Sequence, residues 1–253
     1  MASSRLGQHF LKDPAIAQRE IDYAGLTRDD IVLEIGPGKG ALTRLLARAA
    51  RQVIAVEIDP GLATQLAATL PDNVLLIRGN AVTLDFASLP RFTKVVANLP
   101  FWISSEFTIK LLDCPFDKAI LIYQWEFAQR LAASPGSKHY GRLSVLIAYK
   151  AACRLLERVP RTSFDPTPAV DAAIVELIPR RQPEFSVRNE AFFFDIVRRL
   201  FTHRRKKIKT TLRAFTPDLD GLPFLDDRVE HLSPEQIGRL SDLLLEKTEK
   251  QPR

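Results

Sequence analysis

Three glycines at alternate positions form the first segment whose residue types can bind a ligand. In Glu34-Ile-Gly36-Pro-Gly38-Lys-Gly40 they directly follow the apolar run Ile31–Ile35. Glycine lets a backbone turn tightly and approach a bound molecule closely. Dinucleotide sites usually read G-x-G-x-x-G, so the E-x-G-x-G-x-G order favours a ligand without a pyrophosphate, such as S-adenosylmethionine. We therefore predict that Gly36 and Gly38 contact this cofactor. A glycine-rich turn without a ligand is the alternative.

Two later positions suit the nucleoside part of such a ligand. Glu57 ends the next apolar run, about 20 residues beyond Gly36, where a carboxylate can accept hydrogen bonds from both ribose hydroxyls. Asp59 points to the same side of an extended strand, so the choice stays open, although Glu57 lies nearer the end of the strand. Asn80 follows the third apolar run and can read the adenine edge. Taken alone, Asn80 is better explained as a turn residue after glycine.

A turn made of Asn98, Leu99, Pro100 and Phe101 follows the fourth apolar run and suits chemistry on a planar exocyclic amine. The side-chain carbonyl of Asn98 and the backbone carbonyl of Leu99 can accept the two amine hydrogens. The nitrogen then becomes pyramidal and its lone pair can face a methyl sulfonium, so catalysis is mainly positioning and needs no general base. Phe101 offers a face for a flipped base. Without the glycine loop upstream, a surface turn would be the better interpretation.

The spacing of apolar runs indicates which elements position these residues. Short runs rich in β-branched residues alternate with helical segments, and strand–helix–strand units of this length are typical of a doubly wound, mostly parallel α/β sheet. The expected strands are 31–35, 53–56, 74–77, 95–97 and 119–123, with a helix over 41–48. Residues 172–178 suggest a closing strand that pairs with residues 155–159.

The pattern becomes helical after two prolines that flank a basic pair at 178–183. Apolar residues recur at helical spacing over 189–201, and Ser233-Pro-Glu-Gln236 has the composition of a capping box. We predict two domains: residues 1–180 as an α/β domain that binds S-adenosylmethionine, and residues 181–253 as a small, all-α, basic domain.

The net charge of +6 over 253 residues comes from one segment. Residues 180–215 carry 11 basic and 3 acidic side chains, whereas residues 1–179 carry 20 and 18, and residues 216–253 carry 5 and 9. Because the cations have no interleaved acids on their expected helix, a phosphate backbone is a better partner than water. The predicted RNA contacts are Arg204, Arg205, Lys206, Lys207 and Lys209. A solvated helix face is the alternative.

Composition also excludes several classes of protein. The two cysteines, Cys114 and Cys153, form no CxxC pair, and the four histidines lack metal-ligand spacing, so we expect neither disulfides nor a metal. Apolar runs such as 119–123 are too short to cross a bilayer, and the N-terminus lacks the apolar core of a signal peptide. We expect a soluble, cytoplasmic protein without a membrane partner, and a monomer.

Several motifs together resemble the ribosomal RNA adenine dimethyltransferases, the KsgA family. Besides the glycine loop and the Asn98–Phe101 turn, the resemblance rests on residues 6–11, 56–59, 135–138, 140–145, 163–168 and 201–207, so it covers nearly the whole chain. It implies a Rossmann-like class I methyltransferase fold, with residues 1–180 as the S-adenosylmethionine-dependent methyltransferase domain and residues 181–253 as a domain that binds RNA or the ribosome. The short N-terminus and the stretch 124–127 resemble archaeal members.

The resemblance also implies an activity and a set of contacts. The expected reaction is S-adenosylmethionine-dependent dimethylation of two adjacent adenosines near the 3′ end of small-subunit rRNA, within a pre-ribosomal small subunit and with a role in its biogenesis. The N-terminal segment with His9 and Leu11 is expected to close over the cofactor, which Gly36, Glu57, Asn80 and Asn98 also contact. Phe164 is expected to stack on the target adenine opposite Phe101.

Two residues depart from the family's usual pattern. The family usually has Asp where Asn80 stands and Tyr where Phe101 stands; the Asn carbonyl can still accept a hydrogen bond, and Phe keeps the stacking face.

Three other functions are alternatives to this one. One alternative is a large-subunit rRNA methyltransferase of the resistance type, and another is an assembly factor that acts mainly by binding the subunit. A nicotinamide oxidoreductase would need its third glycine one residue later.

Overall fold

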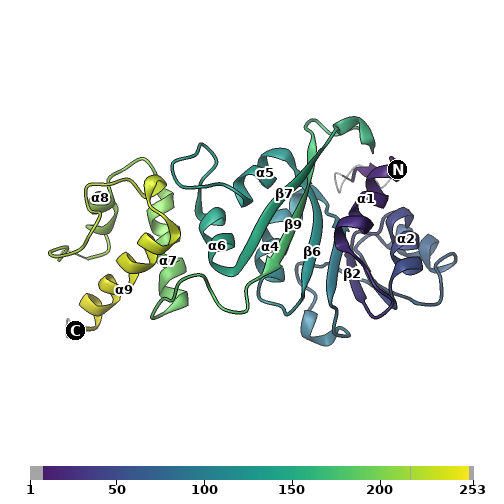
Figure 1. Ribbon diagram of the computed structural model, residues 1–253, viewed down its shortest axis with the longest axis horizontal. Coiled ribbons are helices and arrows are strands. Elements are labelled where there is room, and N and C mark those ends of the chain that lie inside the picture. Colours follow the sequence, from purple (N-terminus) through teal and green to yellow (C-terminus); the bar gives the residue numbers. More distant parts are fainter. Residues whose placement is uncertain (1–7, 217, 251–253) are drawn as a thin grey trace. The chain divides into compact units, whose positions relative to one another are not determined.

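The chain forms two compact units in the computed structural model, which describes residues 8–216 and 218–250. The first unit contains the residues up to Ala128 together with Cys153–Pro179, and the second contains Gln129–Ala152 together with the residues from Arg180 onward (Figure 1). Each unit has its own hydrophobic core.

A mostly parallel sheet runs through the first unit in the strand order β4-β3-β2-β5-β6-β9-β7. The strands are β2 (Ile31–Ile35), β3 (Gln52–Glu57), β4 (Val74–Arg78), β5 (Lys94–Asn98), β6 (Lys118–Gln124), β7 (Ala151–Val159) and β9 (Ala172–Pro179). The strands β2 to β6 are parallel to one another, and β9 is antiparallel to β6. This confirms the α/β class and the strands that the apolar runs predict, including the pairing of β9 with β7.

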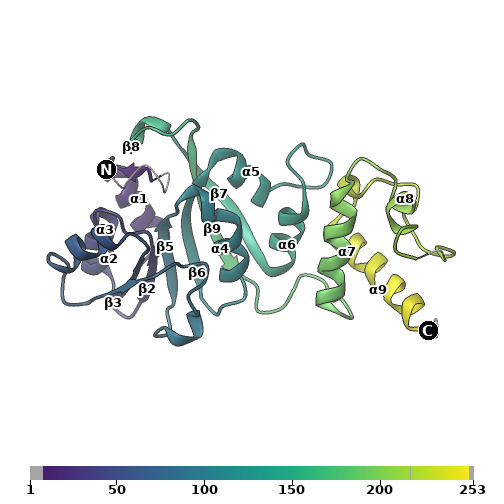
Figure 2. The same ribbon diagram turned by 180° about the vertical axis from the view of Figure 1, so that it is seen from behind.

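Both faces of this sheet are covered, as the near-continuous apolar runs require. Successive side chains point to opposite faces, so Val32 and Ile120 pack with helices α1 (Pro14–Ala24) and α2 (Ala41–Ala49) on one face. Figures 1 and 2, seen from opposite sides, place α4 (Ser104–Leu111) on the other face.

The remaining elements of the first unit are short. They are α3 (Pro60–Ala67), α5 (Trp125–Leu131, which runs into the second unit), and the 3₁₀ turns η2 (Phe86–Ser88), η3 (Phe101–Ile103) and η4 (Arg161–Ser163). Two residues near each end of the unit, β1 (Phe10–Leu11) and β8 (Phe164–Asp165), pair antiparallel outside the main sheet.

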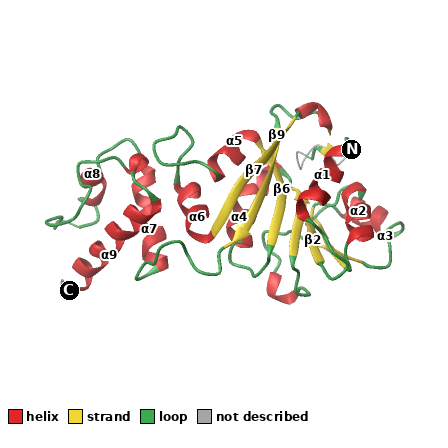
Figure 3. Cartoon of the chain, viewed as in Figure 1, coloured by secondary structure: helices red, strands yellow, loops and turns green. Residues whose placement is uncertain are grey.

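The second unit is built from helices, coloured red in Figure 3. They are α6 (Arg142–Lys150), α7 (Glu190–Thr202), α8 (Ile208–Leu212), η5 (Val229–His231) and α9 (Pro234–Lys250). The predicted capping box forms: the Ser233 amide donates to Gln236 Oε1 at 2.8 Å, and the Gln236 amide donates to Ser233 Oγ at 3.1 Å.

The structure groups residues 129–152 with the second unit, although the expected boundary at 180/181 placed them in the first domain. The reason is packing: Tyr140, Val145 and Tyr149 are buried in the same core as Phe193. The roles assigned to the two domains stay a prediction. Both cysteines are free thiols. No helix within residues 8–216 and 218–250 has the length and apolar character needed to cross a membrane.

Candidate active site

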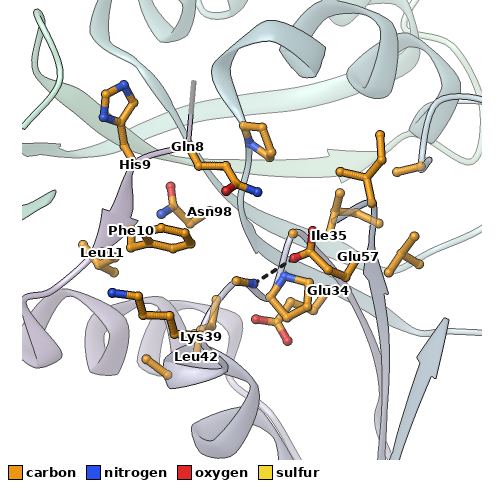
Figure 4. A pocket seen from close by; sticks show the side chains of 18 of the residues that line it. Gln8, His9, Phe10, Leu11, Glu34, Ile35, Lys39, Leu42, Glu57 and Asn98 are labelled. Carbon is orange, nitrogen blue, oxygen red and sulfur yellow. Dashed lines mark hydrogen bonds between the residues drawn. The ribbon is translucent and has the colours of Figure 1, made fainter. Parts of the chain in front are cut away.

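A cavity of about 360 Å³ opens at the carboxyl ends of the parallel strands (Figure 4). Strand β2 lies between β3 and β5, so the strand order reverses at this point, and ligands of doubly wound sheets bind outside the strands' carboxyl ends at such reversals. The volume is typical of small-molecule sites. All seven predicted cofactor contacts line the cavity: His9, Leu11, Gly36, Gly38, Glu57, Asn80 and Asn98.

The glycine loop forms the floor of this cavity in a conformation that requires glycine. Gly36, Gly38 and Gly40 have φ angles of 68°, 57° and 77°, in the left-handed region that L side chains rarely adopt. A Cβ on Gly38 would lie 2.9 Å from ring atoms of Phe10, and one on Gly36 would lie 3.3 Å from Pro100 Cδ. The loop therefore brings the N-terminal segment and the Asn98–Phe101 turn close to the backbone.

The structure separates the two carboxylates between which the sequence left a choice. Glu57 is buried at the cavity, where Oε2 accepts from the Gly38 amide at 3.1 Å and Oε1 accepts from the Asp59 amide at 2.8 Å. The Asp59 carboxylate instead caps α3 by accepting from the amides of Gly61 and Leu62 at 2.7 and 3.0 Å. Of these two residues, Glu57 lines the cavity and Asp59 does not.

Burial and hydrogen bonding act in opposite directions on Glu57. Burial raises the pKa of its carboxyl, and the amides of Asp59 and Gly38 partly oppose this by donating to it. The net pKa is raised.

Asn80 has the turn role that was the alternative for it, and it also lines the cavity. Its Oδ1 accepts from the Val82 amide at 2.9 Å, and the Leu84 amide donates to its backbone carbonyl at 2.8 Å. Within the described residues its Nδ2 has no hydrogen-bond partner. The Nδ2 donors of Asn80 and the second lone pair of its Oδ1 therefore stay available at the cavity.

Asn98 ends β5 at the edge of the cavity, and the half-buried side chain makes no hydrogen bond within the part of the chain that the structure describes. The Leu99 side chain is buried, so this residue can act on a ligand only through its backbone. Pro100 lies against Gly36, which fixes the turn relative to the glycine loop. These contacts bring the two predicted motifs to one site.

The aromatic residues near this turn differ in what they expose. The predicted stacking residue Phe164 is fully buried in the core, so in this conformation it offers no face to a base. Phe101 is half-buried, with its ring centroid 5.6 Å from that of His9. Trp102, which the sequence analysis did not single out, is 50% exposed and lines the cavity. Its position beside the Asn98–Phe101 turn was the only sequence signal.

The N-terminal segment lies over the glycine loop, apart from Leu6 and Gly7 of its motif, which fall outside the described residues. His9 Nδ1 lies 2.7 Å from the Pro166 carbonyl oxygen, to which it can only donate. The Lys39 ammonium lies 5.0 Å from the centroid of the Phe10 ring. Phe10 is thus a further cavity residue, missed because its contact with Gly38 joins distant parts of the chain.

Two buried carboxyls lie beneath the loop. Burial raises the pKa of Glu34, which lines the cavity, to about 8. Burial also raises the pKa of Glu20 well above its ordinary value, and the nearby Glu34 raises it further. Neither Glu20 oxygen has a hydrogen-bond partner in the described residues. At neutral pH the folded protein therefore holds protons at these two carboxyls that the unfolded chain has already released.

We expect Glu20→Met to stabilise the protein more at pH 8 than at pH 5. A raised carboxyl pKa makes the free energy of unfolding fall as the pH rises from the ordinary glutamate value towards the folded-state value. Removing the unpaired buried carboxyl should add about 1–3 kcal/mol at pH 8. Urea unfolding at both pH values measures this, with the exposed Glu106→Met as the control. An equal gain at both pH values would contradict the assignment.

Residues 203–209, which hold the predicted RNA contacts, do not form the helix that was expected, and several of their cations pair with acidic residues. Helix α7 ends at Thr202, and α8 begins only at Ile208. Residues 203–206 between them form a turn. These acidic partners are Asp226 and Glu230, which are distant in sequence, because residues 203–209 contain no acidic residue.

Three of the five predicted RNA-contact residues pair with these acids. Arg204 Nε lies 2.9 Å from Glu230, while Lys207 and Lys209 lie 2.9 and 2.7 Å from Asp226. Hydrogen bonds from Lys209 and Lys207 lower the pKa of Asp226 to about 2. Arg205 and Lys206 are exposed and have no ion pair among the described residues.

Comparison with known proteins gives matches that extend over both units. The family model described as ribosomal RNA adenine dimethylase matches residues 1–245. A probable ribosomal RNA small subunit methyltransferase A of Methanosarcina acetivorans is 43% identical over 94% of this chain and 92% of its own length. The crystal structure of a dimethyladenosine transferase from Plasmodium falciparum is 28% identical, with a TM-score of 0.81 over 96% of this chain and 98% of that one. The 23S rRNA methyltransferase ErmE is 30% identical, with a TM-score of 0.68 over 92% and 98%.

Proposed function

Because the chain belongs to the ribosomal RNA adenine dimethylase family and has a class I methyltransferase fold, we propose that it dimethylates two adjacent adenosines of small-subunit rRNA. The reaction gives N6,N6-dimethyladenosines near the 3′ end of that RNA. The observation that carries this proposal is the cavity shared by the glycine loop, Glu57 and the Asn98–Phe101 turn. One part suits a nucleoside cofactor and the other suits an exocyclic amine.

The cavity fits S-adenosylmethionine, which supplies an electrophilic methyl group when bound. The backbone at Gly36 and Gly38 carries no side chain towards the ligand. Each Glu57 oxygen accepts one backbone amide and keeps a further lone pair, so both can accept a ribose hydroxyl. The second lone pair of Asn80 Oδ1 can accept from the 6-amino group of the adenine. His9 and Leu11 cover the cavity from the N-terminal segment.

The Asn98–Phe101 turn performs the positioning. Asn98 Oδ1 and the Leu99 carbonyl accept the two hydrogens of the target amine, which directs its lone pair towards the methyl group. Pro100, held against Gly36, keeps these acceptors at a constant distance from the cofactor loop. The proton lost after transfer leaves to water, so the chain needs no general base.

We expect Trp102→Ala to lower methylation of RNA about tenfold while the affinity for S-adenosylmethionine stays within about twofold. Stacking of a base on an aromatic side chain contributes roughly 1–3 kcal/mol, and Trp102 is the exposed aromatic residue at the cavity. Initial rates at subsaturating RNA, together with calorimetric cofactor titrations, measure both. Trp102→Phe keeps a stacking face and serves as the control. Equal rates for the Ala and Phe variants would remove Trp102 from the site.

We propose that RNA binding by the second unit depends on Arg205 and Lys206, which are exposed and make no ion pair with the described residues. Neutralising both to Gln should weaken binding and reduce the slope of log affinity against log salt by about 1.4–1.8, from 0.7–0.9 for each phosphate contact. Asp226→Asn, which releases Lys207 and Lys209, should strengthen binding instead. Filter binding to small subunits over a range of salt measures both slopes. Identical slopes for all three proteins would exclude this surface.

The proposed function is tested by transfer of labelled methyl groups into undermethylated small subunits, followed by mass-spectrometric mapping of the modified adenosines. Label found only in large-subunit RNA would support the alternative that the likeness to ErmE raises. Subunit binding without any transfer would leave an assembly factor. We propose that the protein acts as a monomer in the cytoplasm on a pre-ribosomal particle.

A further inference from the structure

A lysine outside the cavity holds the loop that carries Asn80. Lys110, in the last turn of α4, donates from Nζ to the backbone carbonyls of Ala81, at 3.1 Å, and Val82, at 2.8 Å. It also donates to the carbonyl of Leu84. The same ammonium lies 4.4 Å from the centroid of the Phe86 ring.

These contacts use all the hydrogen-bonding capacity of the lysine. An ammonium has three donors, and here three carbonyls of one short segment receive them. Lys110 makes no ion pair among the described residues, and its burial lowers the pKa of the ammonium. A surface lysine held for solubility would be exposed instead, so this one has a local role.

The clamped segment is a wall of the cofactor cavity. Gly79, Asn80 and Ala81 line the cavity, and the clamp begins at Ala81. Asn80 organises the amides of the segment, since its Oδ1 accepts from Val82. Lys110 organises the carbonyls. With both sets occupied, the orientation of the Asn80 side chain is fixed from two sides.

The clamp also connects the two halves of the site. Helix α4 follows directly from η3 and the Asn98–Phe101 turn, so Lys110 is on the same continuous segment as the residues that hold the target amine. The contact therefore ties the adenine wall to the element that positions the substrate.

We propose that Lys110 is a positioning residue that holds Asn80 in register with the adenine of the cofactor, an inference that rests on the proposed function. Lys110 itself does not line the cavity. Replacing Lys110 should therefore lower the preference of the protein for adenine over other bases in the cofactor, and the protein should stay folded.

The test compares S-adenosylhomocysteine with its inosine counterpart, in which a carbonyl replaces the 6-amino group. We expect the wild-type protein to prefer the adenine compound, and Lys110→Met to lose on the order of tenfold of that preference, the effect of about one hydrogen bond. The double variant Lys110→Met/Asn80→Ala should discriminate no less than Asn80→Ala alone, because Lys110 acts through Asn80.

Lys94 provides a matched control, because it begins β5 at the end of the strand opposite to Asn98. Lys94 donates to the carbonyls of Ala24 and Gly25 at 3.1 and 2.6 Å and pairs with Asp30 at 3.2 Å. Lys94→Met removes the same kind of clamp far from the cavity and should leave the preference unchanged. Circular dichroism establishes that each variant is folded at the temperature of the titration.

A second variant keeps the test decisive if Lys110→Met does not fold. Lys110→Arg retains the charge, but a planar guanidinium cannot aim three donors at three converging carbonyls, so the preference should fall by a smaller factor. Wild-type preference in both Lys110 variants would overturn the proposal. A protein that discriminates the bases through Lys110 but transfers no methyl group to RNA would instead overturn the proposed function alone.

Discussion

Replacing Asn98 with alanine lowers the rate of methyl transfer to RNA by roughly 10²–10³-fold, the usual effect of removing one preorganised polar group from the reacting atoms. The expected fold is unchanged, because the Asn98 side chain has no hydrogen-bond partner within the described residues whose loss would leave a group unpaired. Although Asn98 lines the cofactor cavity, the affinity for S-adenosylmethionine should change by less than about tenfold.

The measurement is single-turnover methyl transfer with saturating cofactor, together with a calorimetric titration of the cofactor. Asn73→Ala is the matched control, because this asparagine donates to the Ala47 carbonyl at 2.9 Å and does not line the cavity. It should lower stability and leave the rate unchanged. If Asn98→Ala retained both methyl transfers at the wild-type rate, the role assigned to this turn would be lost.

Replacing Glu57 with alanine lowers the affinity for S-adenosylmethionine by roughly 10²–10⁴-fold, since hydrogen bonds to a charged group contribute about 1.5–3 kcal/mol each and two ribose hydroxyls lose their acceptor. Glu57→Gln should also be severe. One carboxylate oxygen becomes an NH₂ group, so either the Gly38 amide or the Asp59 amide faces a donor instead of an acceptor.

The same carboxylate predicts how cofactor binding depends on pH. The ionised form is the better acceptor, and burial raises the pKa of Glu57. The affinity should therefore be complete above that raised pKa and should fall as the pH drops through it. Calorimetric titrations across the acidic range, with Glu57→Gln as the reference, measure this dependence. A variant whose affinity has the same pH profile as the wild type would show that another group titrates.

Asp59→Ala separates the two carboxylates. Loss of the cap on α3 should lower the free energy of unfolding by about 1 kcal/mol. The cofactor affinity should stay within about threefold of the wild-type value, because Asp59 does not line the cavity. The opposite result, in which Asp59→Ala weakens binding and Glu57→Ala does not, would reverse the assignment that the sequence left open.

Local rules were enough to predict the frame of this protein. The period of the apolar runs located β2 to β6, since a buried parallel strand must be apolar on both faces. The glycine spacing located the loop, because a turn with positive φ at three positions tolerates little else. Glu57 and Asn98 followed from the rule that the carboxyl ends of parallel strands meet at one edge.

The features that sequence reasoning missed all depend on contacts between distant parts of the chain. The Phe10 ring lies against Gly38, and Lys110 reaches the loop after β4. The acids that pair with Arg204, Lys207 and Lys209 are Glu230 and Asp226. No periodicity records which distant side chain arrives at a given place, because that is set by how the elements pack.

The amino-acid sequence by itself therefore determined the fold class, the two motifs and the type of chemistry, which are properties of short segments with strong backbone preferences. Only the tertiary structure decided which residues of those segments are accessible. In the folded protein Phe164 is buried and Trp102 is exposed. Asp59 caps a helix, and Arg205 and Lys206 make no ion pair with the described residues. Burial and pairing are outcomes of the whole packing arrangement, and a side chain's type sets only its preference for them.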